Sequence, residues 1–387
     1  MTNFIELGLS KPLSALVAQL GFTQPTEIQE KTIPHILSGQ DVLASAQTGS
    51  GKTAAYALPI IECLEIPDKS PRALILAPTR ELAQQVEQQF QMFGEKTKLR
   101  AVTIYGGSGY EQQRRELKRG VDIVVATPGR LLDLVESGDC KLSAVEILVL
   151  DEADRLLDMG FMPQVRRIIR KLSPERQTLM FSATIDDRVK YIASEFQMNP
   201  VTIQVNTTRI EPTEIEQRMY HVNEFNKDAL LAQLIQESKM ESVIVFTRTR
   251  RKANWVKSRL REANVMAEEI HGEISQSQRE KTLSMYRNGA FSVLVATDVA
   301  ARGLDIPSIS HVINYDLPDS PEDYVHRIGR TGRAGRSGVA LSFVSDEQRH
   351  LIRDIEKITG RVLDPNAQAR KTQALRRPQV PRRRRFI

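Results

Sequence analysis

The segment AQTGSGKT at 46–53 has glycines, a lysine and a threonine at a spacing that can bind phosphates. The predicted phosphate loop consists of Gln47, Thr48, Gly49, Ser50, Gly51, Lys52 and Thr53. Its glycines let backbone N–H groups turn inward around an anion, its lysine can reach the β- and γ-phosphates, and its threonine hydroxyl can ligate Mg²⁺. Because Ala46 stands where the strict pattern has glycine, a tight turn with an incidental lysine is the alternative.

A second segment with chemical potential is DEAD at 151–154, which follows the short apolar run ILVL at 147–150. A phosphate loop needs an acid at the end of a second apolar strand, and Asp151 would hold Mg²⁺ there, through water. Glu152 would orient or deprotonate the attacking water. The alternative is that these carboxylates only cap the helix that follows them.

The third segment, HRIGRTGR at 326–333, presents Arg330 and Arg333 three residues apart. Phosphoryl transfer needs positive charge at the γ-phosphate as the transition state develops, and two arginines can supply it. A basic RNA-contact loop or a pair of surface ion pairs is the alternative. Taken together, the three segments predict ATP hydrolysis with ATP and Mg²⁺ as ligands.

The elements that must position these residues are short apolar, β-branched runs, each followed by polar or glycine residues and then a helical stretch. Such runs predict an α/β fold of mostly parallel sheets flanked by helices, in which ligands bind beyond the carboxyl ends of the strands. In the first half the predicted strands span 41–46, 73–77, 101–105, 122–126, 147–150 and 177–181. In the second half they span 242–246, 267–270, 292–296, 311–315 and 339–344.

The length of 387 residues is enough for two domains. We expect one domain over 1–205 and another over 214–363, joined by the polar, proline-containing segment 206–213. Within the rest, 364–387, the residues from 365 onward carry eight of the 54 lysines and arginines and no acid, which leaves 46 basic against 48 acidic residues before residue 365. This basic tail has few apolar residues, so we expect it to be disordered and to attract nucleic acid.

The composition is that of a globular protein, with 41% hydrophobic and 26% charged residues. The N-terminus has no basic stretch followed by an apolar run, and no apolar run approaches the roughly 20 residues that span a bilayer. We therefore expect neither a signal peptide nor membrane association. The two isolated cysteines, Cys63 and Cys140, fit a reducing cytoplasm. Nothing in the sequence suggests an obligate oligomer, so we expect a monomer.

Eight segments in this order resemble the motifs of the DEAD-box RNA helicases. They are AQTGSGKT (46–53), PTRELA (78–83), GG (106–107), TPGR (127–130), DEAD (151–154), SAT (182–184), ATDVAARGLD (296–305) and HRIGRTGR (326–333). The tract FMPQVRRIIR after the acidic motif, together with the short basic tail, is similar to the bacterial RhlE-type subgroup. The resemblance implies two RecA-like domains, RNA-stimulated ATP hydrolysis, and local unwinding of RNA duplexes without sequence specificity.

The same resemblance implies roles for residues outside the phosphate chemistry. Gln29, in GFTQPTEIQ at 21–29, would hydrogen-bond the adenine edge, and Phe4 would stack on the ring, although a core aromatic is the simpler interpretation of Phe4 alone. Asp305 would contact the ribose. The residues implied to couple hydrolysis to RNA binding are Ser182, Thr184, Asp154 and His326. Without the resemblance, Ser-Ala-Thr is an ordinary turn at a strand end.

The RNA contacts implied by the resemblance use backbone, hydroxyl and single cationic groups. They are Pro78, Thr79, Arg80, Gly107, Thr127 and Arg130 in the first half, and Arg248, Gln276, Arg279, Thr297 and Gly303 in the second. Such groups bind phosphates and 2′-hydroxyls and not base edges. Aromatic residues make up only 5% of the chain, so base stacking is not the expected binding mode.

Two other functions use the same motifs. One is an ATP-gated RNA clamp, in which unwinding is incidental, and the other is a DNA translocase. Strand release from a partial duplex separates a helicase from a clamp, and ATPase stimulation by RNA or by DNA separates the two nucleic acids. The expected partners are RNA single strands and short duplexes, with a ribosomal or messenger ribonucleoprotein as a candidate substrate.

Overall fold

The computed structural model describes residues 3–46, 49–64, 68, 70–205, 215–238, 240–298, 309–332 and 337–363. The chain divides into two compact units, Met1–Thr207 and Thr208–Ile387. The predicted linker, 206–213, and the predicted basic tail, 364–387, lie outside the described residues.

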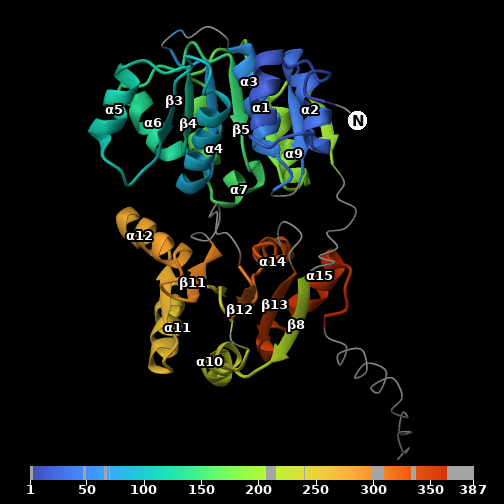
Figure 1. The fold of residues 1–387 in the computed structure, drawn as a ribbon, viewed down its shortest axis with the longest axis vertical. Helices are drawn as coiled ribbons and strands as arrows, with labels where there is room; N and C mark the ends of the chain where they lie inside the picture. The colour runs from blue at the N-terminus through green and yellow to red at the C-terminus, as the bar shows by residue number, and fades with distance from the viewer. Residues whose placement is uncertain are drawn as a thin grey trace, which may run out of the picture. The chain divides into compact units, whose positions relative to one another are not determined.

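The first unit is built on a seven-stranded parallel sheet with the order β3-β4-β2-β5-β6-β1-β7 (Figure 1). Its strands are β1 (Val42–Ser45), β2 (Ala73–Leu76), β3 (Ala101–Ile104), β4 (Ile123–Ala126), β5 (Ile147–Leu150), β6 (Gln177–Ser182) and β7 (Val201–Gln204). Its helices are α1 (Lys11–Gln19), α2 (Glu27–Leu37), α3 (Lys52–Cys63), α4 (Arg80–Phe93), α5 (Tyr110–Lys118), α6 (Pro128–Glu136), α7 (Ala153–Asp158), α8 (Met162–Ile169) and α9 (Asp187–Phe196).

Side chains alternate between the two faces of this sheet, so the unit has a core on each side. On β2, Ile75 packs into the core with the residues of α1–α4, whereas Leu74 and Leu76 face the core formed with α6, α8 and α9. All three side chains are fully buried. A sheet covered on both faces explains why its central strands are continuous apolar runs.

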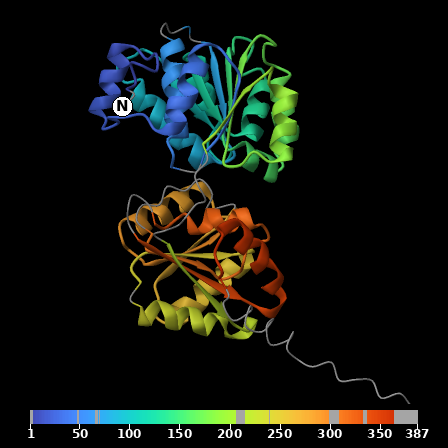
Figure 2. The same cartoon turned by 90° about the vertical axis from the view of Figure 1, so that its right-hand side faces the viewer.

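The second unit has a six-stranded parallel sheet with the order β10-β11-β9-β12-β13-β8. Its strands are β8 (Ile215–His221), β9 (Val243–Thr247), β10 (Ala267–Ile270), β11 (Val293–Thr297), β12 (His311–Asn314) and β13 (Gly338–Val344). Its helices are α10 (Lys227–Glu237), α11 (Arg250–Glu262), α12 (Gln276–Arg287), α14 (Pro321–Ile328) and α15 (Arg349–Thr359), with 3₁₀ turns η1 (Glu224–Asn226) and η2 (Asp346–Gln348). One face of the sheet packs on α10 and α11, and residues of α12, α14 and α15 join separate clusters with the other strand faces (Figure 2).

The predicted fold class is confirmed, and all eleven predicted strands are present with ends that differ by at most one residue. Two further strands, β7 and β8, were not predicted. Both are edge strands, and their side chains are mostly exposed or half-buried and largely polar, so neither forms an apolar run. Edge strands pair on one side only and need fewer apolar residues, which is why the apolar pattern missed them. No helix in the described parts of the chain has the length and apolar character that crossing a bilayer requires.

The packing of the second sheet can be tested by truncating a side chain in its interior. Ile244, on β9, is 0% exposed, so we expect Ile244→Ala to lower the free energy of unfolding by about 2–5 kcal/mol. Met266 is 63% exposed, and Met266→Ala should change the free energy of unfolding by less than about 0.5 kcal/mol. Urea unfolding followed by the fluorescence of Trp255, the single tryptophan, reports on this unit. Equal losses in the two variants would contradict the burial of β9.

Candidate active site

The phosphate loop lies between β1 and α3, at the carboxyl end of the first sheet. Gly49 and Gly51 have φ angles of +85° and +92°, a backbone region that disfavours other residues. Lys52 is the first residue of α3, is 8% exposed, and donates from Nζ to the Ala46 carbonyl oxygen at 2.5 Å. Burial lowers the pKa of Lys52, and nearby acids oppose that shift. The loop residues Gln47 and Thr48 lie outside the described residues.

Gln29 lies against this loop although it belongs to α2. Its side-chain oxygen accepts from the Thr26 backbone N–H at 3.0 Å in a capping box, and its Nε2 donates to the Gly51 carbonyl oxygen at 3.1 Å. A Cβ atom at Gly51 would lie 2.4 Å from this Nε2, so the glycine is also required by the contact. The structure thus places Gln29 beside the phosphate loop. Phe4 is only 4% exposed and packs in the adjacent hydrophobic core, so its ring is covered by protein.

Asp151, directly after β5, faces α3 and is 2% exposed. Its Oδ2 accepts a hydrogen bond from the Tyr56 hydroxyl at 2.7 Å, and the Thr53 side chain hydrogen-bonds to the same hydroxyl. Burial and then the charge of Glu152 raise the pKa of Asp151 to about 6. Mg²⁺ commonly takes one or two protein oxygens together with water and substrate phosphates. The Thr53 hydroxyl and the Asp151 carboxylate are donors of that kind, so they fit such an ion.

Glu152 has a left-handed backbone conformation with φ = 50° and ψ = 54°, which is costly for a residue with a side chain. It stands at the N-cap of α7, yet its side chain caps no backbone group of that helix. Its Oε2 instead accepts from Arg155 Nη1 at 2.7 Å, and the guanidinium is itself buried. The geometry therefore does not support the interpretation of Glu152 as a helix cap, although Asp151 and Asp154 accept from the backbone N–H groups of Glu152 and Arg155. It holds Glu152 at the strand end beside Asp151.

The acidic motif, the phosphate loop and the SAT segment are joined through backbone groups. Asp154 Oδ2 accepts from the Ala183 backbone N–H at 3.2 Å, and the Ala46 N–H donates to the Ser182 carbonyl oxygen at 3.2 Å. Ser182 is 0% exposed, whereas Thr184 is exposed. Burial raises the pKa of Asp154. Asp154 thus contacts the SAT segment at Ala183, and not at the hydroxyls of the two predicted coupling residues.

The predicted RNA-contact residues of the first unit follow β2, β3 and β4 at the same edge of the sheet. A Cβ atom at Gly107, whose φ is +86°, would overlap the Arg80 guanidinium, so these two residues touch. The Arg130 guanidinium lies 4.0 Å from the centre of the Tyr110 ring and donates to the Ser108 carbonyl oxygen at 3.1 Å. The other three predicted RNA-contact residues of this unit are buried, and they are Pro78, Thr79 and Thr127.

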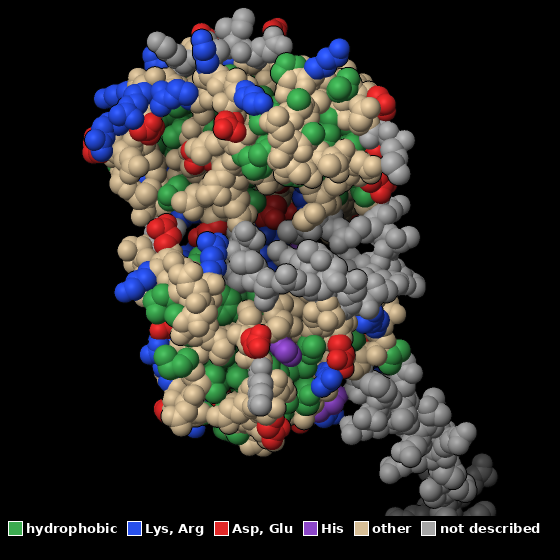
Figure 3. All heavy atoms as spheres, viewed as in Figure 1, with side chains coloured by type: hydrophobic (Ala, Val, Ile, Leu, Met, Phe, Trp, Pro, Cys, Tyr) green, Lys and Arg blue, Asp and Glu red, His purple; other side chains and the backbone are tan. Residues whose placement is uncertain are grey.

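Helix α5, which begins at Tyr110, carries positive charge toward its C-terminal end. Figure 3 shows Lys and Arg side chains gathered over this end of the first unit. The exposed cations of the helix and its C-cap are Arg115, Lys118 and Arg119. The Arg119 carbonyl oxygen accepts from Arg100, the residue before β3, so these cations lie near the amino end of that strand.

In the second unit, the predicted residues that the structure describes also lie near strand ends or on adjoining helices. Arg248 and Thr297 lie at the ends of β9 and β11, and Arg279 lies on α12. His326 is on α14, and Arg330 follows that helix with only 7% of its surface exposed. This burial disfavours surface ion pairing as the explanation of Arg330. Outside the described residues lie Gly303, Asp305 and Arg333, and the side chain of Gln276.

Three residues near the site were missed by the sequence analysis. Tyr56 follows Lys52 by one helical turn, so both lie on one face of α3. This spacing could have identified Tyr56 as a residue of the site. Arg155 follows Glu152 by three residues, which is the same kind of signal. Arg327, 3% exposed, binds Asp298 on another element, and no local spacing reveals that contact.

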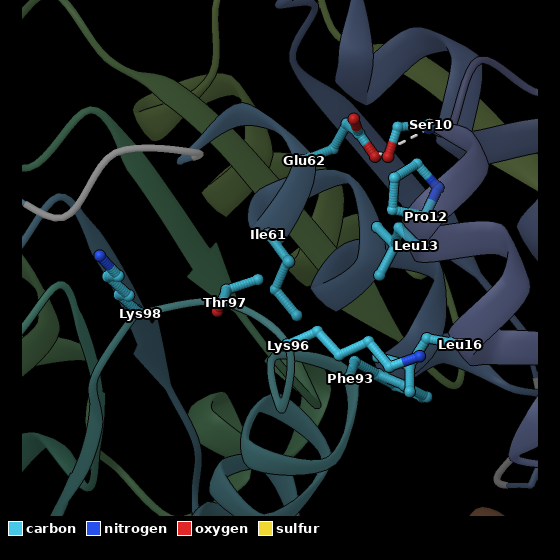
Figure 4. A pocket seen from close by; sticks show the side chains of 10 residues that line it. All are labelled: Ser10, Pro12, Leu13, Leu16, Ile61, Glu62, Phe93, Lys96, Thr97 and Lys98. Atoms are coloured by element: carbon cyan, nitrogen blue, oxygen red, sulfur yellow. Dashed lines mark hydrogen bonds between the residues drawn. The ribbon is translucent and has the colours of Figure 1, made fainter.

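The first unit also has a pocket of about 460 Å³ away from the strand ends (Figure 4). It lies where α3 and α4 end, near α1, whereas the phosphate loop lies where α3 begins. Its floor is apolar, with Leu13, Leu16 and Phe93, and Lys96 and Lys98 stand at its rim. Glu62 in its wall accepts from the Ser10 backbone N–H at 2.9 Å. This pocket is separate from the residues predicted to bind ATP.

The raised pKa of Asp151 predicts how stability depends on pH. Because the folded chain holds a proton on this carboxyl up to about pH 6, whereas the unfolded chain loses it near pH 4, stability falls as pH rises through that window. Asp151→Asn removes the buried charge. In EDTA and without nucleotide, we expect this variant to unfold with a free energy about 1–3 kcal/mol higher than the parent at pH 7, and with little difference near pH 4.

Urea unfolding followed by circular dichroism at the two pH values measures this difference. Asp187→Asn, at an exposed aspartate of the same unit, is the matched control and should show no such gain. A variant at Asp151 that was less stable than the parent at neutral pH would contradict the prediction.

Comparison with known proteins agrees with this geometry. The family model DEAD/DEAH box helicase matches residues 26–192, and the model helicase conserved C-terminal domain matches residues 226–335. RNA helicase CrhR of Synechocystis sp. is 47% identical over 356 residues, which cover 92% of this chain and 72% of that protein. DEAD-box ATP-dependent RNA helicase CshA of Geobacillus kaustophilus is 42% identical over 364 residues, which cover 94% of this chain and 78% of the relative.

Among solved structures, S. cerevisiae Dbp5 bound to RNA and ADP BeF3 is similar, with a TM-score of 0.84 and 33% identity over 97% of this chain and 99% of that one. The similarity extends over both units, and both family models match. Together with the phosphate loop and the acidic strand end, these findings show that the chain belongs to the DEAD-box family of RNA helicases.

Proposed function

We propose that this DEAD-box RNA helicase hydrolyses ATP at the carboxyl end of the first sheet and couples the hydrolysis to the binding and local opening of RNA. The observation that carries the proposal is the buried group formed by Lys52, Asp151 and Glu152 at the ends of β1 and β5, which lie on either side of β6. A cation and two carboxylates in a site of low exposure act strongly on a nucleotide phosphate.

Each residue of this group has a separate role in the proposal. Lys52 exchanges its hydrogen bond to the Ala46 carbonyl for the phosphates, and the loop N–H groups bind the remaining phosphate oxygens. Thr53 and Asp151 would hold Mg²⁺, which when bound supplies positive charge at the β- and γ-phosphates. Glu152, fixed by Arg155, orients the attacking water or takes its proton.

The second unit supplies the remaining groups of the proposal. Arg330 and Arg333 would stabilise charge on the transferring phosphate, and Asp305 would contact the ribose. Gln29 would bind the adenine edge, and Phe4, whose ring is covered by protein in this structure, would have to be uncovered to stack on the base. Since the acids precede residue 206 and these arginines follow residue 213, we expect neither half alone to hydrolyse ATP appreciably.

RNA is bound in the proposal through its backbone. Arg80, Gly107 and Arg130 in the first unit and Arg248 and Thr297 in the second are groups that suit phosphates and 2′-hydroxyls. Asp154, joined to Ala183, together with Ser182, Thr184 and His326, would transmit the state of the nucleotide to these contacts. We further propose that the protein acts in the cytoplasm as a monomer on ribosomal or messenger ribonucleoproteins. The similarity to the RhlE-type subgroup stays a prediction.

A single substitution tests the catalytic assignment. Glu152→Gln keeps the size of the side chain but cannot take a proton, so we expect nucleotide binding within about threefold of the parent and a loss of RNA-stimulated ATP hydrolysis of at least about 100-fold. Lys52→Ala should weaken nucleotide binding itself. Binding of a fluorescent ATP analogue and phosphate release, each measured with and without poly(U), separate the two effects.

The control for this experiment is Glu136→Gln, which changes an exposed carboxylate of the same unit that pairs with Arg167 on the surface. It should hydrolyse ATP at the parental rate. Hydrolysis at the parental rate in Glu152→Gln would show that the site is wrongly assigned. Stimulation by single-stranded DNA equal to that by poly(U) would contradict RNA as the partner.

A further inference from the structure

The second unit contains a buried polar network around Asp316, a residue that belongs to none of the motifs noted in the sequence. Asp316 follows β12 and is 8% exposed. Its Oδ1 accepts from Lys227 Nζ at 3.2 Å, and its Oδ2 accepts from the Arg248 backbone N–H at 3.0 Å. Its carbonyl oxygen accepts from Arg327 Nη1 at 2.6 Å. One residue thus binds three elements of the unit.

The charge of Asp316 is required by its surroundings. Lys227 is 0% exposed, and a buried ammonium is stable only with anions close to it. Its second anion is Glu224, whose Oε2 lies 2.8 Å from Nζ, and Glu224 also binds Lys252 at 2.9 Å. Because Lys227 holds Oδ1, the carboxylate plane is set and Oδ2 points at the backbone of Arg248.

Arg327 extends the network to the end of β11. Its Nε and Nη2 donate to the two carboxylate oxygens of Asp298 at 2.6 and 2.7 Å, and its Nη1 also donates to Asn314 Oδ1 at 3.2 Å. Its guanidinium lies 5.0 Å from the centre of the Phe246 ring. Asp298 directly follows Thr297, so the network reaches both strand ends that carry proposed RNA contacts.

We propose that Asp316 is a positioning residue for RNA binding, which fixes the backbone of Arg248 and, through Arg327, the strand end at Thr297. This inference rests on the proposed RNA contacts of Arg248 and Thr297. Burial makes the fixation effective, because a hydrogen bond to a charged acceptor in a site of low exposure resists exchange with water. Arg248 then enters an RNA complex with its backbone already ordered, which reduces the entropy lost on binding.

A second aspartate touches the same arginine and gives a matched comparison. Asp319 Oδ1 lies 3.1 Å from Arg248 Nη2, but its side chain is 81% exposed. It contacts the guanidinium, the group that would bind a phosphate, whereas Asp316 contacts the backbone N–H. Removing the charge of Asp319 should therefore free the guanidinium, and removing the charge of Asp316 should release the backbone that presents it.

The test compares Asp316→Asn, Asp319→Asn and Arg248→Ala in the full chain by the poly(U) concentration that gives half-maximal ATPase activity. We expect Arg248→Ala and Asp316→Asn each to raise this concentration about tenfold. In Asp316→Asn, turnover at saturating poly(U) should stay within about twofold of the parent. Asp319→Asn should leave it unchanged or lower it. Circular dichroism melting shows in each case that the variant is folded at the assay temperature.

A compensating variant separates positioning from stability alone. In Asp316→Asn, the amide oxygen is drawn to Lys227, and the amide N–H₂ group is left facing the Arg248 N–H, another donor. Adding Lys227→Met removes that competition, so the amide oxygen can turn to Arg248. We expect the double variant to return to within about threefold of the parental half-saturation.

The outcomes are distinct. Parental half-saturation in Asp316→Asn, beside a tenfold rise in Arg248→Ala, would overturn the positioning role and leave the RNA contact intact. If the double variant needed as much poly(U) for half-maximal activity as Asp316→Asn, the positioning role would also be overturned. A purely structural defect would persist in this way, whereas a defect in positioning should be relieved. No change in Arg248→Ala would contradict the proposed RNA contact itself, and the inference with it.

Discussion

The burial of charged side chains at the carboxyl ends of parallel strands is the constraint on which the rest of this structure depends. An isolated charge taken out of water costs several kcal/mol or shifts its pKa, so each one needs partners in the fold. Lys52 and Asp151 lie together with few exposed atoms, and Tyr56 and the chain's backbone supply the remaining hydrogen bonds. Their pKa values move toward the neutral forms, as burial requires. A bound nucleotide phosphate would pair with the Lys52 ammonium, and its cation would pair with the Asp151 carboxylate.

The same constraint links motifs that are far apart in the sequence. Glu152 needs Arg155, and Asp154 needs the N–H of Ala183, so the acidic motif cannot move without its neighbours. The phosphate loop is attached to the same strand through Ala46 and Ser182. A network of this kind has few independent parts, and it is suited to passing a change at the phosphate site to other strand ends.

The two units have similar strand-to-helix turns after β2 and β9. Both Thr79, after β2, and Thr249, after β9, cap the helix that follows with the side-chain oxygen and have nearly the same backbone angles. In the first unit the adjoining cation, Arg80, rests against Gly107. In the second, Arg248 is held by Asp316. In both units, the cationic groups that we propose as contacts for an RNA backbone are thus presented by strand-to-helix turns whose backbone is hydrogen-bonded from within the fold.

The sequence by itself determined the fold class, the central strands and the identity of the phosphate and acidic motifs. These follow from local patterns, because a strand covered on both faces must be apolar along its length and a phosphate loop needs glycine, lysine and threonine in one turn. Tertiary structure alone decided which groups meet. Edge strands β7 and β8 carry too little apolar character to be recognised, and Lys227, Asp316 and Arg327 are joined across 89 and 11 residues of chain, where no spacing predicts a contact. Burial of a charge depends on what surrounds it in three dimensions, and that is the property a linear pattern lacks.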